Sequence, residues 1–236
     1  MDLRKVWEQR AAQWREWARK PGHDPYWAYS DSFFEHIVPP HPGTVLEIGC
    51  GEGRVTRSLA TQSDTVVGID TSPTLVADAL AADNDSGYVV GDAAMLPFRN
   101  DSFDTVVAYN SLMDLNDMPQ GIAEASRVLK GGGRFCVCIV HPLRDAGQFT
   151  TDEVDAPFAL TDYFESRRYE DSFERDGLQM TFTSCRYPLS DYADALERAG
   201  LLIERIKEPL PDPSKKPELQ RAQRIPMFLF LRALRP

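Results

Sequence analysis

Residues 45–54 read VLEIGCGEGR and join an apolar run to a set of closely spaced glycines. The apolar run is typical of a buried strand, and it carries one acid, Glu47. The glycines follow at alternate positions: Gly49, Gly51 and Gly53. Because glycine adopts positive φ and has no side chain, such a turn lets a ligand approach the backbone closely. A helix is predicted from Arg54 on, so the turn suits a nucleotide-like or carboxylate-bearing ligand at a helix N-terminus.

The composition is that of a globular protein with an acidic balance. The chain has 236 residues and a formal net charge of -10. This length can bury a sizeable core, as one domain or as a domain plus a cap. Proteins that bind nucleic acids usually carry a basic footprint, so we expect neither DNA nor RNA as substrate. No apolar run reaches the ~18 residues of a membrane helix, and the charged N-terminus does not resemble a signal peptide. We therefore expect no membrane association and a cytoplasmic location.

Strands and helices alternate from residue 43 onward. Apolar runs predict strands at 44–50, 65–70, 87–92, 103–110, 134–140, 179–187, 201–208 and 226–234. Helices are expected at 54–62, 73–82, 119–129 and 190–199, with Ser72 and Ser190 as N-caps and the glycines 131–133 ending the third. Near-continuous apolar strands are typical of a parallel sheet that helices cover on both faces. The alternation predicts an α/β, doubly wound fold.

The first 39 residues are expected to form a helical lid. Residues 2–19 are predicted to be helical, and Trp7, Trp14 and Trp17 share one face of that helix. Asp24-Pro25 is expected to begin a second helix that ends near Val38. So much aromatic area suggests a lid over a ligand, although two helices merely buried against the main domain would give the same pattern.

Regularity fails over residues 143–185, which are rich in charged and aromatic side chains. The segment is too long for a bare loop in a compact domain, so we expect an inserted substrate cap. The core is then expected to comprise residues 40–142 and 186–236.

Two further acids end predicted strands. Asp70 ends the second strand and Asp92 the third, where the carboxyl ends of parallel strands form one edge of the sheet. A carboxylate at Asp70 can accept both hydroxyls of a ribose, and one at Asp92 can accept from an adenine amino group. Each acid alone could be a strand-end cap, but three successive strands with such acids predict a nucleoside-containing ligand.

No metal is expected. Four cysteines are present, Cys50, Cys136, Cys138 and Cys185, and none has a C-x-x-C spacing. Buried free thiols are the favoured interpretation. A site made of Cys136, Cys138 and His141 would lack a fourth ligand at a zinc-like spacing.

In combination, five segments resemble class I S-adenosylmethionine-dependent methyltransferases, in particular the small-molecule branch of the methyltransferase type 11 kind. The matching segments are VLEIGCGEGR, VVGIDTSP, GDAAMLPF, FDTVVAYNSLMDL and RVLKGGGRF, in this order. They cover about residues 43–140, and the C-terminal part is similar too. The resemblance implies a Rossmann-like, seven-stranded sheet whose last strand is antiparallel, with S-adenosylmethionine as cofactor and S-adenosylhomocysteine as product.

The resemblance also implies a role for each matching residue. Glu47 and the backbone at Gly49, Gly51 and Gly53 would surround the methionine part of the cofactor. Three pairs of neighbouring residues would contact the rest of the cofactor: Asp70 and Thr71 the ribose, Asp92 and Ala93 the adenine, and Asn110 and Ser111 the sulfonium. Tyr26 would close over the cofactor.

For catalysis, His141 is the predicted general base, because it follows the fifth strand at the carboxyl edge of the sheet. The alternative is a structural His-Pro turn. Asp114, Tyr163, Tyr169 and Tyr187 are candidate substrate contacts, although Asp114 could be a helix cap and the tyrosines core residues.

These observations predict methyl transfer from S-adenosylmethionine to a small-molecule substrate, with O-methylation favoured because His141 offers a base. N- or C-methylation stays open, as does a non-catalytic partner subunit that only binds the cofactor. A nicotinamide oxidoreductase is disfavoured by the G-x-G-x-G spacing. An enzyme that methylates a protein is not excluded. The chain is expected to be a monomer or a homodimer.

Overall fold

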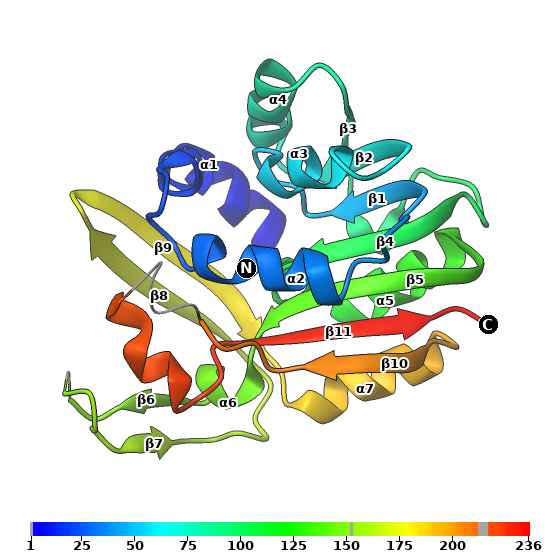
Figure 1. Ribbon diagram of the computed structural model, residues 1–236. Coiled ribbons are helices and arrows are strands. Elements are labelled where there is room, and N and C mark those ends of the chain that lie inside the picture. The colour runs from blue at the N-terminus through cyan, green and yellow to red at the C-terminus, as the bar shows by residue number, and fades with distance from the viewer. Residues whose placement is uncertain (1, 152, 212–216) are drawn as a thin grey trace.

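The computed structural model describes residues 2–151, 153–211 and 217–236 (Figure 1). The α-helices are α1 (Leu3–Arg19), α2 (Tyr26–His36), α3 (Arg54–Ala60), α4 (Pro73–Ala82), α5 (Met118–Val128), α6 (Pro142–Asp145) and α7 (Leu189–Arg198). Three 3₁₀ turns are η1 (Ala93–Met95), η2 (Leu112–Asp114) and η3 (Pro217–Gln223). The strands are β1 (Thr44–Ile48), β2 (Thr65–Asp70), β3 (Gly87–Val90), β4 (Phe103–Tyr109), β5 (Leu129–Val140), β6 (Gly147–Phe149), β7 (Phe158–Leu160), β8 (Arg167–Arg175), β9 (Leu178–Arg186), β10 (Leu202–Lys207) and β11 (Phe228–Leu234).

The main sheet has seven strands in the order β10-β11-β5-β4-β1-β2-β3. β11 is antiparallel to both of its neighbours, whereas β3, β2, β1, β4 and β5 are mutually parallel. The predicted doubly wound sheet with an antiparallel last strand is therefore confirmed. Because β1, β2, β3, β4 and β5 are parallel, their carboxyl ends lie along the same edge.

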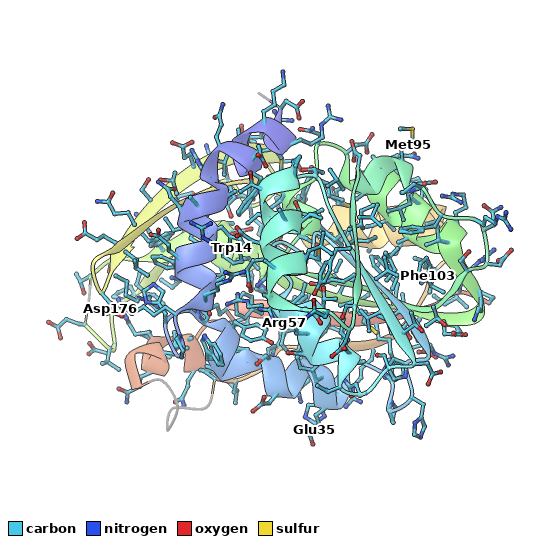
Figure 2. All side chains as sticks on the ribbon, turned by 90° about the horizontal axis from the view of Figure 1, so that it is seen from above. Trp14, Glu35, Arg57, Met95, Phe103 and Asp176 are labelled. Carbon is cyan, nitrogen blue, oxygen red and sulfur yellow. The ribbon has the colours of Figure 1, made fainter. Side chains whose placement is uncertain are left out.

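Each face of the sheet is covered by helices, as the apolar strands predict. On one face, α5 and α7 pack on alternate residues of the central strands, such as Val106 and Phe135. On the other face, α2 and α3 pack on the intervening residues, such as Val107 and Cys136. Thus α2, expected in the lid, contributes Tyr29 and Phe33 to the core of the sheet. Helix α1 lies away from the sheet, beside β9 and α4 (Figures 1 and 2).

Part of the segment predicted to be irregular is a long hairpin. β8 and β9 pair antiparallel over their whole length, with Arg175 opposite Leu178. The two residues between them, Asp176 and Gly177, both have positive φ, at 51° and 76°. An Asp-Gly pair with these angles is a two-residue hairpin turn that matches strand twist. The sequence prediction missed β8 because charged residues dominate it, although the Asp-Gly turn signal was present.

Three smaller predictions were wrong. The glycines 131–133 do not end a helix; they lie inside β5, which begins directly after α5. Ser190 is not an N-cap, because α7 begins at Leu189 and Pro188 precedes it. Asp24 does not cap α2; its carboxylate instead forms an ion pair with Arg54 at 2.7 Å. By contrast, the predicted Ser72 cap is confirmed, since its hydroxyl accepts from the N–H of Leu75.

The helices within the described ranges include none with the length and apolar character to cross a membrane.

Candidate functional site

A cavity of about 880 Å³ lies at the carboxyl edge of the parallel strands. This volume is at the upper end of the ~300–1,000 Å³ typical of small-molecule sites. Its lining comes from the ends of β1, β2, β4 and β5, from α1, and from the segment between β5 and α7. Eleven of the predicted cofactor and substrate residues line it: Tyr26, Glu47, Gly49, Gly51, Asp70, Thr71, Ala93, Asn110, Ser111, Asp114 and Tyr169.

The glycine turn is shaped by close crossings of the chain. A Cβ atom at Gly49 would lie 2.4 Å from Cβ of Ser111, and one at Gly51 would lie 2.9 Å from Nε1 of Trp14. Both glycines also have positive φ, at 71° and 54°. Any side chain at either position would displace Ser111 or the α1 tryptophan, so the turn keeps the cavity wall thin.

Two acids line the cavity beside this turn. Asp70 accepts hydrogen bonds from the backbone N–H groups of Gly51 and Ser72, both at 2.8 Å, which fixes its carboxylate at the end of β2. Glu47 accepts a hydrogen bond from the Thr56 hydroxyl. Burial, together with repulsion from the neighbouring Asp70, raises the pKa of Glu47 to about 8. A buried carboxyl of this kind would be stabilised in its charged form by a cationic ligand.

Two predicted cofactor residues do not line the cavity. Gly53, at φ 85°, is the left-handed residue before α3, and a Cβ there would lie 2.7 Å from the Tyr88 hydroxyl. Asp92 caps η1 by accepting from the N–H of Ala94, and its other oxygen pairs with Arg4 at 2.9 Å.

The loop after β4 forms the middle of the cavity wall. Asn110 has a φ of 53°, a left-handed conformation that asparagine tolerates better than most residues. The Ser111 hydroxyl donates to the carbonyl of Ile48 at 2.6 Å and so joins the ends of β4 and β1. Tyr26 closes the same side, with its hydroxyl 3.0 Å from that of Ser58 and its ring under the Arg54 guanidinium.

Helix α1 closes the cavity from above through two sets of contacts. Toward the sheet, three arginines form ion pairs: Arg4 with Asp92, Arg15 with Asp78, and Arg19 with Glu52. In addition, Glu8 accepts hydrogen bonds from the hydroxyls of Ser72 and Thr74. Toward the hairpin, Arg10 pairs with Glu170 at 2.7 Å. The three tryptophans of α1 line the cavity: Trp7, Trp14 and Trp17.

Acidic and aromatic side chains from the 143–186 segment line the far end. The Tyr169 hydroxyl donates to Asp145 at 3.1 Å, and the Ser184 hydroxyl donates to Asp114 at 2.5 Å. Burial raises the pKa of Asp145 to about 7 and that of Asp114 to about 8. Repulsion from Asp145 and Asp70 raises the pKa of Asp114 in the same direction as burial does.

The structure does not bring His141 into the cavity. Its Nδ1 accepts from the N–H of Leu143 at 3.1 Å, and its Nε2 lies 3.0 Å from the Glu208 carboxylate. One ring nitrogen thus caps the start of α6, and the other contacts Glu208 just after β10. This arrangement corresponds to the structural His-Pro turn. Two predicted substrate contacts also lie elsewhere: the Tyr163 hydroxyl accepts from the N–H of Leu189, and Tyr187 stacks edge-on with Tyr192.

Sequence reasoning missed several charged residues in the cavity, among them Arg144, Asp145 and Arg186. For the residues of the hairpin, the signal in the sequence was that every second side chain of a strand faces the same side. In β8 every second residue from Arg167 to Arg175 lines the cavity, and in β9 so do Phe182, Ser184 and Arg186. A strand places alternate side chains on one face, so recognising the hairpin would have identified this wall.

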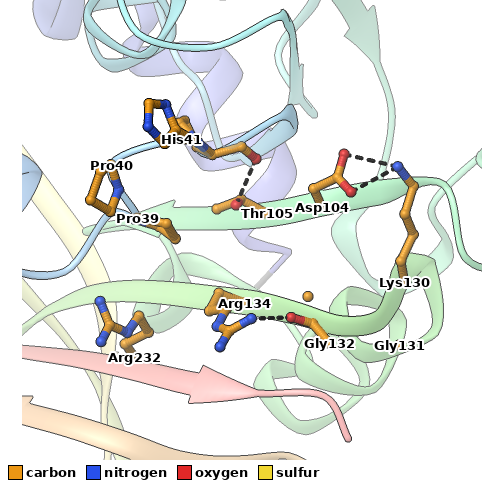
Figure 3. Close-up of a pocket in the computed structure, with 12 residues that line it drawn as sticks. Pro39, Pro40, His41, Asp104, Thr105, Lys130, Gly131, Gly132, Arg134 and Arg232 are labelled. Atoms are coloured by element: carbon orange, nitrogen blue, oxygen red, sulfur yellow. Dashed lines mark hydrogen bonds and ion pairs between the residues drawn. The ribbon is translucent and has the colours of Figure 1, made fainter.

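A second hollow lies at the opposite edge of the sheet, where residues 39–42, Asp104, Lys130 and Arg134 line it (Figure 3). Its charges already pair with one another or nearby: Lys130 with Asp104 at 2.8 Å, and both Arg134 and Arg232 with Glu204. It therefore offers less to a charged ligand than the first cavity does. Within the described residues, no group of three or more histidine, cysteine or acidic side chains could hold a metal ion.

Comparison with known proteins identifies the central segment. Residues 46–137 match the family model described as "Methyltransferase domain". A demethylmenaquinone methyltransferase of Clavibacter sepedonicus is 32% identical over 120 residues, which are 50% of this chain and 48% of the relative. An O-methyltransferase of Pyrenophora dematioidea is 32% identical over 106 residues, 42% of this chain and 40% of the relative. The matched segment thus spans less than half of each relative.

The fold match is broader. An S-adenosylmethionine-dependent methyltransferase structure from Mesorhizobium loti superposes with a TM-score of 0.74 at 23% identity, over 90% of this chain and 98% of that one. The expected resemblance is confirmed by these matches: residues 46–137 match a methyltransferase domain, and the chain has the fold of this S-adenosylmethionine-dependent methyltransferase structure.

Proposed function

We propose that this protein transfers a methyl group from S-adenosylmethionine to a small molecule, with oxygen as the favoured nucleophile. The observation that carries the proposal is one continuous cavity whose wall runs from the acids at the strand ends to the charged hairpin. The first end suits the cofactor. The second end, with its hydroxyl, carboxyl and guanidinium groups, suits a polar acceptor.

The side chains and backbone groups at the cofactor end support the binding of S-adenosylmethionine. Asp70 presents a carboxylate that two backbone N–H groups hold in place, which supports its assignment to the ribose hydroxyls. The thin wall at Gly49 and Gly51 leaves room for the methionine part, and Glu47 would balance its positive charge. When bound, S-adenosylmethionine supplies a methyl carbon whose bond to sulfur breaks, with the electron pair left on sulfur, as the acceptor's lone pair bonds to that carbon.

The chain's own residues would position the acceptor and take its proton. Holding two reactants in line can lower a barrier by ~7–11 kcal/mol in well-oriented cases. For a hydroxyl acceptor, we assign the proton to Asp114, because its carboxyl lines the cavity beside the cofactor end and has a pKa of about 8. A carboxylate with that pKa is a better base at neutral pH than an ordinary one. This assignment replaces His141, whose ring nitrogens are engaged outside the cavity.

We propose that α1 serves as the lid and residues 143–185 as the cap. The tryptophans of α1 and the aromatic residues of the hairpin, such as Phe173 and Phe182, would exclude water from the reacting atoms. Trp14 and Trp17 each contact Phe182 edge-on, so lid and cap support each other.

Calorimetry with S-adenosylhomocysteine tests the cofactor part of the proposal. Asp70→Ala should weaken binding at least tenfold, whereas Asp64→Ala, an exposed acid before β2, should leave it unchanged. Unchanged affinity in a folded Asp70→Ala protein would sink the ribose assignment. Release of S-adenosylhomocysteine across a metabolite library then tests transfer itself. Tight binding with no release on any acceptor would indicate the non-catalytic alternative.

A further inference from the structure

Two arginines line the acceptor end of the cavity with buried donors that no described residue accepts. They are Arg144, from α6, and Arg186, from the end of β9. Nη1 of Arg144 and both Nε and Nη1 of Arg186 are buried and make no hydrogen bond to any described part of the chain. A buried cationic donor without an acceptor is costly, because it loses its hydration and gains nothing in return.

Other arginines around the same cavity have acceptors within the protein. Arg54 pairs with Asp24 at 2.7 Å, and Arg175 donates to the carbonyl of His23 at 2.9 Å. Outside this cavity, Arg134 and Arg232 at the opposite edge of the sheet also have an acceptor, since both pair with Glu204. The open donors of Arg144 and Arg186 are therefore a particular property of the acceptor end.

The two guanidinium groups are held against aromatic rings, and both interact electrostatically with Asp145, although no ion pair joins them to it among the described contacts. Arg144 lies over the rings of Phe149 and Phe158, 5.5 and 5.9 Å from their centroids. Arg186 lies over Tyr169 at 6.0 Å. A cation–π contact uses the face of an aromatic ring and no N–H acceptor, so it leaves N–H groups available to bind an oxyanion through two parallel hydrogen bonds.

We propose that the methyl acceptor carries a carboxylate, which Arg186 and Arg144 bind. This inference rests on the proposed function and specifies its substrate class: a small hydroxy or amino carboxylic acid. A carboxylate is favoured over a phosphate because Asp145, Asp171 and Asp114 line the same end of the cavity and would repel a dianion more strongly.

The position of Asp114 supports this arrangement of the acceptor. Asp114 ends η2, three residues after Ser111 on the cofactor wall, and its carboxyl accepts from Ser184, which lies two residues before Arg186 in β9. An acid bound by the arginines would thus place a hydroxyl or amino group near Asp114, between the carboxylate site and the cofactor. The nucleophile's proton would pass to Asp114 as the new bond to the methyl carbon forms.

The test compares carboxylic acids with their primary amides, which have nearly the same shape and no charge. Benzoate, phenylacetate and salicylate, each beside its amide, are titrated against the protein by thermal shift, with and without S-adenosylhomocysteine. At least one acid should stabilise the parent protein more than its amide does, because bound ligand stabilises the native state. Arg186→Gln and Arg144→Gln should each weaken that acid's binding at least tenfold, with the amide unaffected. Arg186→Lys should weaken it less, and Arg134→Gln should not change it.

The inference is overturned if no acid stabilises the protein more than its amide, or if both glutamine variants keep the parent's preference. Its failure is distinct from failure of the proposed function. Calorimetry with S-adenosylhomocysteine reports on the cofactor end, so a protein that binds this product but shows no acid preference contradicts only the carboxylate site.

Discussion

Arg4 of the lid helix and Asp92, the acid that follows β3, form an ion pair with 2.9 Å between Nη1 and Oδ2. The family resemblance assigns Asp92 to the cofactor's adenine, yet the carboxylate is engaged by α1. The same helix is also bonded to Ser72 and Thr74 through Glu8. These contacts join α1 to the edge of the sheet at which the cofactor is proposed to bind, so weakening them should ease the entry of a ligand.

Arg4→Gln should speed the entry of the product analogue. The substitution removes a charge from the lid contact and frees Asp92, so S-adenosylhomocysteine should associate several-fold faster. Since the pair is exposed, high salt should raise the parent's rate toward that of the variant. Stopped-flow tryptophan fluorescence measures this directly, because three tryptophans of α1 line the cavity. Lys5→Gln, one residue along the same helix, is the matched control; an equal change in both variants would contradict a specific role for the Arg4 contact.

Glu47→Gln should change how stability depends on pH. The pKa of Glu47 is about 8 in the folded protein and 4.5 for an ordinary glutamate, so between these values the folded state binds a proton that the unfolded state has released. The parent should therefore lose stability as pH rises from about 4.5 to about 8, and Glu47→Gln should not. From pH 5 to pH 9, we expect the free energy of unfolding of the parent to fall by about 0.5–3 kcal/mol more than that of the variant.

Urea unfolding at pH 5 and pH 9 gives this comparison. The control is Glu35→Gln, an exposed glutamate on α2. Glu47→Gln should also bind S-adenosylhomocysteine more weakly than the parent does, because a neutral amide cannot balance the positively charged amino group of the ligand. A parallel loss of stability with pH in parent and variant would show that Glu47 is not the buried group responsible.

Periodicity made most of the core predictable. Apolar runs such as those at β1 and β4 bury both faces, so their pattern alone fixes the type of element and the layer it joins. Strand-end residues such as Asp70 could be predicted for the same reason: parallel strands bring their carboxyl ends to one edge. The acid cluster with Glu47 follows directly from that topology.

The acceptor end could not be predicted in this way. β8 has few apolar residues, and its register depends on a two-residue turn at Asp176 and Gly177. Arg144 and Arg186 are 42 positions apart in the numbering and come together only because the hairpin folds back over α6. His141 shows the converse case. A residue at the correct edge of the sheet can still have its side chain used by the next helix.

His141→Ala should affect stability more than catalysis. The histidine caps α6, and loss of such a cap costs about 0.5–2 kcal/mol of unfolding free energy. Burial also lowers the pKa of His141 below 6.5, so the parent should lose stability as pH falls below that value, and the variant should not. Turnover should stay within about threefold, because a general base would contribute ~10²–10⁴-fold. A large loss of turnover with unchanged unfolding would restore His141 as the base.

Asp114→Asn should remove the pH dependence of turnover. With burial holding the pKa of Asp114 at about 8 and that of Asp145 at about 7, both carboxyls are largely protonated in mild acid and cannot accept a proton there. Turnover of the parent should therefore rise as pH increases through about 7 to 8. Because the two carboxyls interact, the apparent pKa values of this rise describe Asp114 and Asp145 together. The asparagine keeps the shape and the bond from Ser184 but cannot take a proton, so turnover should fall by ~10²–10⁴-fold and the rise should disappear. Asp171→Asn, another acid that lines the cavity, is the control. If Asp114→Asn keeps the parent's pH profile, the proton passes to a different group, and Asp145 becomes the candidate.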